Sequence, residues 1–256
     1  MKSKLIILGC GSSVGTPRID GYWGNCDKNN KKNIRSRCSA IIIKGSNSIL
    51  IDTSPDIKNQ LLRNKIKKIS SIVFTHEHAD QTNGIFEVRP FYWKYNKKIN
   101  VYGNFRTIKN LMKRYDYLFS KITDYKPIVK ANIINKRFSL GISKEKIHFK
   151  TLKVKHGQIK SLIYIFQKTA YISDSNDLSI TNKKELKNLR YLILDCLNLK
   201  KHPTHFNLKE ALFIHSQLKP KKTILTNLHY DLDYDYLLKI LPNNVIPAHD
   251  GLSLNL

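Results

Sequence analysis

The chain has 256 residues, with 45 Lys and Arg against 19 Asp and Glu, and a formal charge of +26. This length suits a single α/β domain over residues 1–256 with a large core. Its apolar runs are all shorter than the roughly 18 residues that cross a membrane, so we expect no membrane partner. The N-terminal segment has no secretory pattern, and four cysteines without paired spacing indicate thiols, so we expect a cytoplasmic protein.

The first half of the chain alternates short apolar runs with glycine-rich or polar segments. Strands are predicted at residues 4–8, 39–44, 48–51, 69–74 and 100–102. Helices are predicted at residues 54–64, 81–88 and 105–118. Ser54 is the predicted N-cap of the first helix, with Pro55 at its first position. The segment 28–37 is rich in Lys and Arg, and we predict a solvated loop there.

The second half repeats the order of strand and helix. Strands are predicted at residues 147–154, 162–167, 170–172, 191–194, 222–225 and 245–246. Helices are predicted at residues 183–188, 208–218 and 233–241. His156, Asp174 and Asp195 come at or just after the ends of strands. Because α/β proteins build their sites from the loops at strand ends, we expect these side chains to belong to one site.

Residues 71–81 concentrate side chains that bind metals. A buried strand ends there, and His76, His78 and Asp80 follow it at alternate positions. A helix would separate residues i and i+2 by roughly 200°, so this is not a helical metal motif. On a loop, both imidazoles and the carboxylate can converge on one ion, with nitrogens at about 2.0–2.1 Å. The segment therefore predicts a metal-binding loop.

The order of these motifs resembles that of the metallo-β-lactamase fold. Residues 76–81 are similar to its His-x-His-x-Asp-His signature, and residues 50–53, 155–157 and 171–175 correspond to its other motifs. The resemblance covers nearly the whole chain and implies a four-layer αββα sandwich. The Gly-Cys-Gly-Ser-Ser opening of residues 9–17 is similar to the loop that borders the active site of PhnP-like phosphodiesterases and tRNase Z relatives.

The resemblance implies two neighbouring metals. The ligands that it assigns to the first are His76, His78, His156 and Asp174. For the second metal, Asp80 and Asp174 are present, but Gln81 and Asn227 stand where the family has histidines, and His229 is the candidate replacement. Imidazole and carboxylate donors suit Zn²⁺ or Mn²⁺. We expect one tight site and a second site that is weak or absent.

The remaining polar positions support this centre. The resemblance implies that Asp52 holds the metal loop by hydrogen bonds and that His205 is the general acid, with Asp195 or Asn207 orienting it. Asp80 is expected to hold and deprotonate the attacking water. His249, near the C-terminal end, is a candidate for lining the pocket.

These residues predict a hydrolase that uses metal-activated water. The favoured function is a phosphodiesterase acting on a small or cyclic phosphate ester, and a homodimer is a possible assembly. The alternatives are a tRNase Z-like nuclease, a thioester or lactone hydrolase, and a metal-binding relative without catalysis. The positive charge favours anionic substrates, but it is spread along the chain, so nucleic acid is the less favoured partner.

Overall fold

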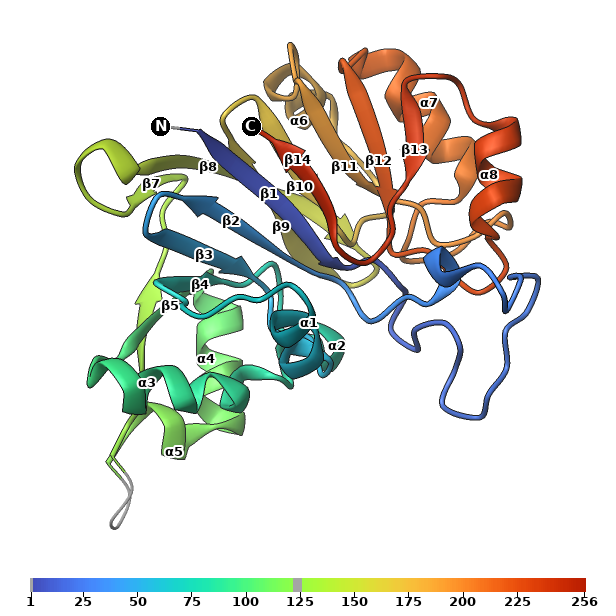
Figure 1. The fold of residues 1–256 in the computed structure, drawn as a ribbon. Helices are drawn as coiled ribbons and strands as arrows, with labels where there is room; N and C mark the ends of the chain where they lie inside the picture. Colours follow the sequence, from blue (N-terminus) through green and yellow to red (C-terminus); the bar gives the residue numbers. More distant parts are fainter. Residues whose placement is uncertain (1, 122–125) are drawn as a thin grey trace.

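Two mixed seven-stranded sheets lie face to face in the computed structural model, which describes residues 2–121 and 126–256 (Figure 1). The first sheet has the strand order β14-β1-β2-β3-β4-β5-β6. Its strands are β1 (Ser3–Gly9), β2 (Ser39–Lys44), β3 (Asn47–Ile51), β4 (Ser71–Val73), β5 (Ile99–Gly103), β6 (Val129–Ile133) and β14 (Leu252–Asn255). The pairs from β14 to β3 are antiparallel, and the pairs from β3 to β6 are parallel.

The second sheet repeats this plan in the order β13-β12-β11-β10-β9-β8-β7. Its strands are β7 (Arg137–Leu140), β8 (Ile147–His156), β9 (Ile159–Phe166), β10 (Thr169–Ile172), β11 (Tyr191–Asp195), β12 (Lys222–Thr226) and β13 (Val245–Pro247). The pairs from β7 to β10 are antiparallel, and those from β10 to β13 are parallel. The pattern missed β6, β7 and β14, which are short edge strands or neighbours of edges.

Helices cover the outer faces of both sheets (Figure 1). Those on the first sheet are α1 (Ile57–Arg63), α2 (Ala79–Thr82), α3 (Arg89–Tyr95), α4 (Phe105–Arg114) and α5 (Asp116–Phe119). Those on the second sheet are α6 (Ile180–Glu185), α7 (Leu208–Leu218) and α8 (Tyr234–Ile240). Short 3-10 turns are η1 (Lys31–Asn33), η2 (Ile85–Val88) and η3 (Ser143–Glu145).

Alternation along the strands divides the apolar side chains between layers. In β1, Leu5 and Ile7 belong to the core between the two sheets, whereas Ile6 and Leu8 belong to the core under the helices. Successive side chains of a strand point to opposite faces, so one apolar run fills both cores. A third core joins the second sheet to α7 and α8. The predicted four-layer αββα sandwich is confirmed.

The first predicted helix begins later than its sequence indicates. Helix α1 starts at Ile57 with Asp56 as its N-cap, so the prediction of Ser54 as the cap was wrong. Ser54 instead closes a turn before the helix: its carbonyl accepts from the Ile57 N–H at 3.0 Å, and its hydroxyl from the Asp56 N–H at 3.2 Å. The local bonding of a short serine competed with the helix for the same residues.

The predicted helix at 81–88 is also broken. Helix α2 ends at Thr82, and the 3-10 turn η2 leads into α3. The cause lies at Gly84, whose N–H donates to the Thr53 carbonyl at 2.9 Å. A Cβ at Gly84 would lie 2.1 Å from the Ser54 carbonyl oxygen, so only glycine allows the two loops to approach this closely.

Two further helices have different bounds from those predicted. The predicted helix at 105–118 divides at Tyr115, where φ is −129° and ψ is 41°, into α4 and α5. Helix α6 lies earlier than the predicted 183–188, because the hydroxyl of Ser179 accepts from the Asn182 N–H and caps it.

The basic segment 28–37 is not simply a solvated loop, because Arg35 is buried. Its Nη2 donates to the carbonyl of Leu232 at 2.7 Å and to the Asn33 side chain at 3.0 Å. Its Nη1 donates to the carbonyl of His229 at 3.2 Å. Arg35 therefore joins the N-terminal loop to the segment that follows β12.

Replacing Arg35 by methionine is expected to lower the free energy of unfolding by roughly 2–4 kcal/mol, because buried carbonyl groups would lose their donors. Urea unfolding of the two proteins measures the change. The control is Arg190→Met, an exposed arginine stacked on the Tyr191 ring, for which we expect a change within about 0.5 kcal/mol. Equal stability of Arg35→Met and the parent protein would contradict the role of Arg35.

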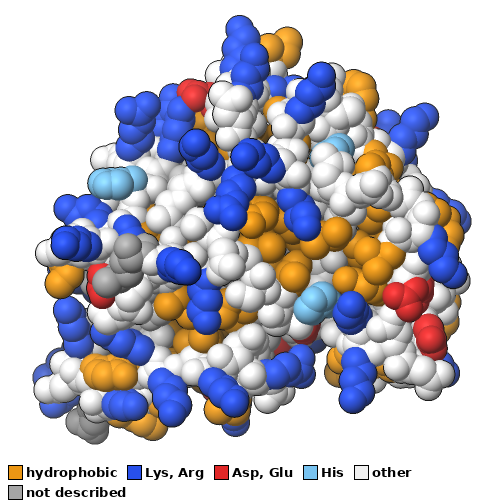
Figure 2. All heavy atoms as spheres, turned by 45° about the horizontal axis from the view of Figure 1, so that its top comes forward, with side chains coloured by type: hydrophobic (Ala, Val, Ile, Leu, Met, Phe, Trp, Pro, Cys, Tyr) orange, Lys and Arg blue, Asp and Glu red, His pale blue; other side chains and the backbone are white. Residues whose placement is uncertain are grey.

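The surface is predominantly basic. Lys and Arg are scattered over the whole face that Figure 2 shows, with few acidic side chains among them, so the charge is not gathered into one band. Within the described residues, no helix has the length and apolar character needed to span a bilayer.

Candidate metal centre

The loop after β4 is held in place by Asp52, which follows β3. The buried carboxylate of Asp52 accepts from the Thr75 N–H and from the Thr75 hydroxyl, both at 2.8 Å. The Thr75 hydroxyl also lies 3.0 Å from Nδ1 of His76. Hydrogen bonds of this kind set the orientation of a metal-binding imidazole. The predicted supporting position of Asp52 thus agrees with its contacts, and Nε2 of His76 is left for another partner.

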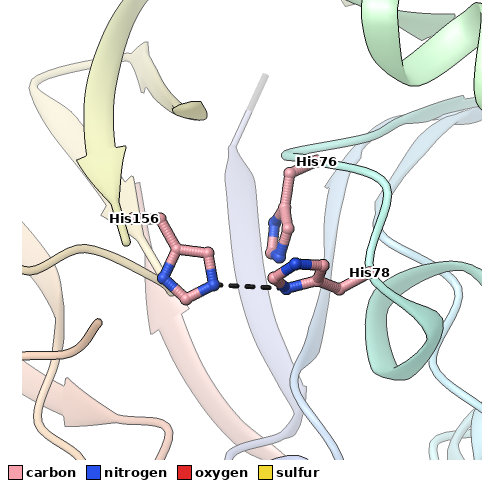
Figure 3. A group of neighbouring side chains, drawn as sticks. All are labelled: His76, His78 and His156. Carbon is pink, nitrogen blue, oxygen red and sulfur yellow. Dashed lines mark hydrogen bonds between the residues drawn. The ribbon is translucent and has the colours of Figure 1, made fainter. Parts of the chain in front are cut away.

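His156 comes to the same point from the end of β8. Its Nδ1 lies 2.8 Å from the carbonyl oxygen of Thr204, which can only accept, so we assign the Nδ1 hydrogen to this bond. Nε2 of His156 is then a free acceptor, 3.2 Å from Nδ1 of His78. The rings of His76, His78 and His156 point toward one another (Figure 3), with centroids 4.5–5.0 Å apart.

These spacings and two unpartnered atoms fit a bound cation. Two nitrogens at about 2.0–2.1 Å from a tetrahedral zinc ion lie about 3.3 Å apart, close to the His78–His156 spacing. Within the described residues, Nε2 of His76 and Oδ2 of Asp174 are buried without a hydrogen-bond partner. Burial lowers the pKa of His76 to about 3, which keeps the imidazole neutral, as metal binding requires. The donors present therefore suit a divalent cation.

A second group of potential ligands shares His156. It consists of His156, Asp174 and His205, and their ligand atoms lie within 4.8 Å of one another. Asp174 follows β10 and is buried. The two groups have His156 in common, so they have the form of two adjacent cation positions with one shared ligand.

His205 is paired with Asp195 at the end of β11. Nδ1 of His205 lies 2.8 Å from Oδ2 of Asp195 and 3.0 Å from Nδ2 of Asn227. The two amide hydrogens of Asn227 are directed to the Ser173 carbonyl and to Oδ1 of Asp195, so the Nδ1 hydrogen of His205 belongs to Asp195. Burial opposes protonation of His205, but Asp195 raises its pKa to about 9.

Comparison with known proteins decides the family. The family described as Beta-lactamase superfamily domain matches residues 47–230. The chain belongs to the metallo-β-lactamase superfamily.

Solved structures of other superfamily members share this fold. A new diphosphatase from the PhnP family is 31% identical, with a TM-score of 0.91 and coverage of 100% of this chain and 98% of that one. Human tRNase Z, short form, is 15% identical, with a TM-score of 0.69 and coverage of 98% of each chain, and this likeness concerns the fold. The predicted relationship to the PhnP branch and to tRNase Z is confirmed.

A curated relative extends well beyond the superfamily domain. It is named Octanoyltransferase, from Porphyromonas gingivalis (strain ATCC BAA-308 / W83), and is 27% identical over 253 residues, which make up 97% of this chain and 51% of that protein. The chain therefore spans about half the length of this relative.

The superfamily's second metal position departs from the usual histidines in a specific way. The side chain of Gln81 is buried and donates to Oδ2 of Asp80 at 3.2 Å. Asn227 is committed to Ser173 and Asp195, as described above. His229 belongs to neither ligand group: its Nδ1 lies 3.0 Å from Asp231, and its ring lies 3.5 Å from that of Tyr230. His205 therefore stands closer to the second position than His229 does.

His205, which shares a ligand group with His156 and Asp174, lines a cavity of about 620 Å³. Asp80, His205, Asn227 and His229 are among its lining residues. Burial and the neighbouring Asp174 raise the pKa of Asp80 to about 6. His249 is not among the residues that line this cavity, and its ring instead lies edge-on to Tyr234 at 6.0 Å. Asn207 caps α7 by a reciprocal hydrogen bond with Glu210, so Asp195 is the residue that orients His205.

Several supporting residues have no signal in the sequence. Glu77, between the two histidines of the signature, is almost fully buried, and its carboxylate accepts from Arg106 and from Thr107 on α4. Arg114, at the end of α4, donates to the Glu77 carbonyl at 2.7 Å. Helix α4 therefore fixes the backbone from which His76 and His78 project. The sequence shows that Glu77 lies between two predicted ligands, but it does not indicate that α4 supplies the hydrogen-bond partners of Glu77.

Replacing Arg106 by alanine is expected to weaken cation binding by roughly 3–10-fold, somewhat less than the loss of a residue bonded directly to a ligand. Titration of the metal-free protein with Zn²⁺ in competition with a chelating dye measures this change. Lys109→Ala, which removes an exposed cation from the same helix, is the matched control and should bind as the parent does. Equal weakening in both variants would assign the effect to net charge.

Proposed function

We propose that this superfamily member hydrolyses a phosphodiester bond in a small or cyclic phosphate ester. The observation that carries the proposal is the His205–Asp195 pair, because His205 lines the cavity and shares a potential ligand group with His156 of the histidine cluster. A cation alone would serve ester, thioester or lactone hydrolysis. An oriented imidazole with a raised pKa adds a proton donor, which a leaving alkoxide needs.

The residues that would hold the cation are His76, His78, His156 and Asp174, and their imidazole and carboxylate donors suit Zn²⁺ or Mn²⁺. A bound divalent cation would neutralise charge on the phosphoryl oxygens and lower the pKa of a water ligand. The shared ligand His156 and the position of Asp174 support a second, weaker cation beside the first.

The side chains divide the proton transfers between them. Asp80, with a pKa of about 6, is ionised at neutral pH and can accept the proton of the attacking water. His205 holds one proton at Nδ1 toward Asp195 and donates the other from Nε2 to the leaving oxygen. Asp195 keeps the ring in this orientation and stabilises its charged form, as the carboxylate does in other His–Asp pairs.

The second candidate function is hydrolysis of a diphosphate. It is favoured by the 31% identity to a diphosphatase from the PhnP family. The two reactions make different demands on His205. A phosphate leaving group departs without protonation, whereas an alkoxide does not. Strong dependence on His205 therefore supports the diester, and weak dependence supports the diphosphate.

The test compares substrates with one metal-free preparation of the full chain, reloaded with Zn²⁺ or Mn²⁺. We expect hydrolysis of bis(p-nitrophenyl) phosphate to be absent after chelation and restored by the cation. Cleavage of a nucleoside diphosphate without cleavage of the diester would favour the second candidate. Turnover of a thioester or lactone alone, or of no substrate with either cation, would overturn both.

A further inference from the structure

We infer that Asn227 is a positioning residue for the general acid, His205, and that it acts through Asp195. The superfamily resemblance puts a histidine ligand of the second metal at this position, and this chain has an amide there instead. The change replaces an imidazole ligand by hydrogen-bond support for a proton transfer. The inference rests on the proposed function, because it concerns the proton that a leaving alkoxide needs.

The ends of three neighbouring strands bring the side chains together. Strands β10, β11 and β12 are parallel, and Asp195 at the end of β11 is paired with Thr226 at the end of β12. Ser173 directly follows β10, and Asn227 directly follows β12. Asn227 has a φ of +62°, a left-handed conformation that asparagine adopts more readily than most residues. Ser173, Asp195 and Asn227 therefore lie at one edge of the sheet.

Two acceptors fix the orientation of the Asn227 amide. Its Nδ2 lies 3.2 Å from the Ser173 carbonyl oxygen and 3.1 Å from Oδ1 of Asp195. A carbonyl oxygen and an ionised carboxylate only accept hydrogen bonds, so we assign the nitrogen of the amide to this side. Both amide hydrogens are used in these bonds, and Asn227 is only 2% exposed. The nitrogen end of Asn227 is thus committed to holding Asp195.

Asp195 is held at both of its carboxylate oxygens. Oδ2 accepts from the Ser175 N–H at 2.9 Å and from Nδ1 of His205 at 2.8 Å. Among the described residues, Asn227 is the one donor to Oδ1. Asp195 is fully buried, so an oxygen without a donor would be costly, and a rotation of the carboxylate would recover part of that cost. Without Asn227, we therefore expect Asp195 to turn and its bond to His205 to weaken.

Asn227 also contacts the imidazole directly. Its Nδ2 lies 3.0 Å from Nδ1 of His205. Because both amide hydrogens are directed elsewhere, this contact packs against the ring and limits its rotation. Both residues line the cavity. A general acid must keep its proton within hydrogen-bond reach of the leaving oxygen, so restraints on the Nδ1 side of the ring also set the position of the Nε2 proton.

The experiment measures how the leaving group changes the effect of Asn227→Gly, because glycine removes the side chain and tolerates the positive φ. With the Zn²⁺-loaded full chain, we expect kcat for 2′,3′-cyclic AMP to fall roughly 10–100-fold, the usual effect of losing a residue that orients a functional group. The loss with bis(p-nitrophenyl) phosphate should be at least about fivefold smaller, because p-nitrophenolate departs without a proton. Cations per chain should not change.

The matched control is Asn182→Ala. Asn182 is also a buried asparagine, and its Nδ2 donates to the Lys153 carbonyl at 3.0 Å, but it does not line the cavity. We expect this variant to be less stable than the parent protein and to keep the parent's ratio of kcat values for the two substrates. A purely structural role of Asn227 would give the same result in both variants.

A second measurement does not require turnover. The Nδ1 proton of His205 is followed by NMR in metal-free protein labelled with ¹⁵N-histidine, and His205→Ala identifies its signal. We expect this proton to exchange with solvent roughly tenfold faster in Asn227→Gly, which is equivalent to the loss of one hydrogen bond. Asn182→Ala should leave the exchange rate as it is in the parent protein.

Three results would overturn the inference: equal losses with the two substrates, an unchanged exchange rate, or the loss of a cation, which would make Asn227 a ligand. If Asn227→Gly does not fold, Asn227→Asp is the second variant, because it keeps the shape of the side chain and its ionised form has no hydrogen to donate. The same results are expected for it. Faster exchange in a protein that hydrolyses no phosphate ester would retain the support of Asp195 by Asn227 and reject the proposed reaction.

Discussion

Replacing His205 by alanine is expected to lower kcat/KM for a cyclic phosphodiester, whose leaving group is an alkoxide, by roughly 10²–10⁴-fold, the usual contribution of a positioned general acid. The hydrogen bond to Asp195 at 2.8 Å fixes Nδ1 of His205, and His205 lines the cavity. Without this imidazole, the leaving oxygen would have to depart unprotonated. Steady-state kinetics with bis(p-nitrophenyl) phosphate should show a smaller loss, because p-nitrophenolate departs without a proton.

The cation content of the His205→Ala protein separates two roles of this residue. His205 belongs to a potential ligand group with His156 and Asp174, so it must also be tested as a ligand. Unchanged cations per chain by elemental analysis, together with the loss of rate, would support the acid. Loss of a cation would make His205 a ligand of the second position. The control is His148→Ala, because His148 is exposed and its Nδ1 lies 2.7 Å from the Ser139 hydroxyl, away from the ligand groups, and it should behave as the parent does.

Replacing His76 by alanine is expected to remove the tightly bound cation and to lower kcat/KM by roughly 10³-fold or more, since a cation supplies several kcal/mol of transition-state stabilisation. His76 is fully buried, and its unpartnered Nε2 faces the centre. Elemental analysis and the diester assay measure both effects on one sample. The metal-free parent protein is the reference, because it should show a similar rate and a similar fold by circular dichroism.

A His76→Ala protein that keeps its cation and its rate would contradict the assignment of the triad. A protein that keeps the cation but loses activity would place the ion elsewhere in the cavity. Asp52 and Thr75 orient His76 through hydrogen bonds. Asp52→Asn should therefore lower the affinity for the cation about 10–100-fold without removing a ligand. The two variants therefore compare how much cation affinity is lost when a ligand is removed and when only its hydrogen-bond support is changed.

The sequence was most informative for site residues that lie directly after a predicted strand. The alternation of His76, His78 and Asp80 argued against a helical metal motif, and the two histidines do precede α2 and converge with His156, whereas Asp80 lies on α2. The strand ends that carry His156, Asp174 and Asp195 could be recognised because each follows a buried apolar run. The supporting role of Asp52 was implied by the family resemblance, and its carboxylate accepts hydrogen bonds from Thr75, next to His76. Each of these features lies within one strand and the loop that follows it, so a short stretch of sequence is enough to predict it.

Features that depend on distant partners could not be found in this way. The burial of Arg35 requires carbonyls from residues nearly two hundred positions later, and a basic segment alone reads as solvated. The break at Gly84 depends on a contact with Ser54, and the anchoring of Glu77 on a helix that follows another strand. Arg18 and Arg37 are among the residues that line the cavity, and this wall likewise forms only when the N-terminal loop meets the second sheet. Long-range pairing, which no local propensity encodes, decides all of these.

The pairing of β14 with β1 has a consequence for how the chain is made. Strand β1 is synthesised before the other strands of this domain, but its partner on one side consists of residues 252–255. Until translation reaches that point, β1 presents an open row of peptide groups and apolar side chains. The nascent domain therefore has an unprotected sheet edge until its last strand is made, and we expect it to be a client of chaperones that bind extended segments during translation.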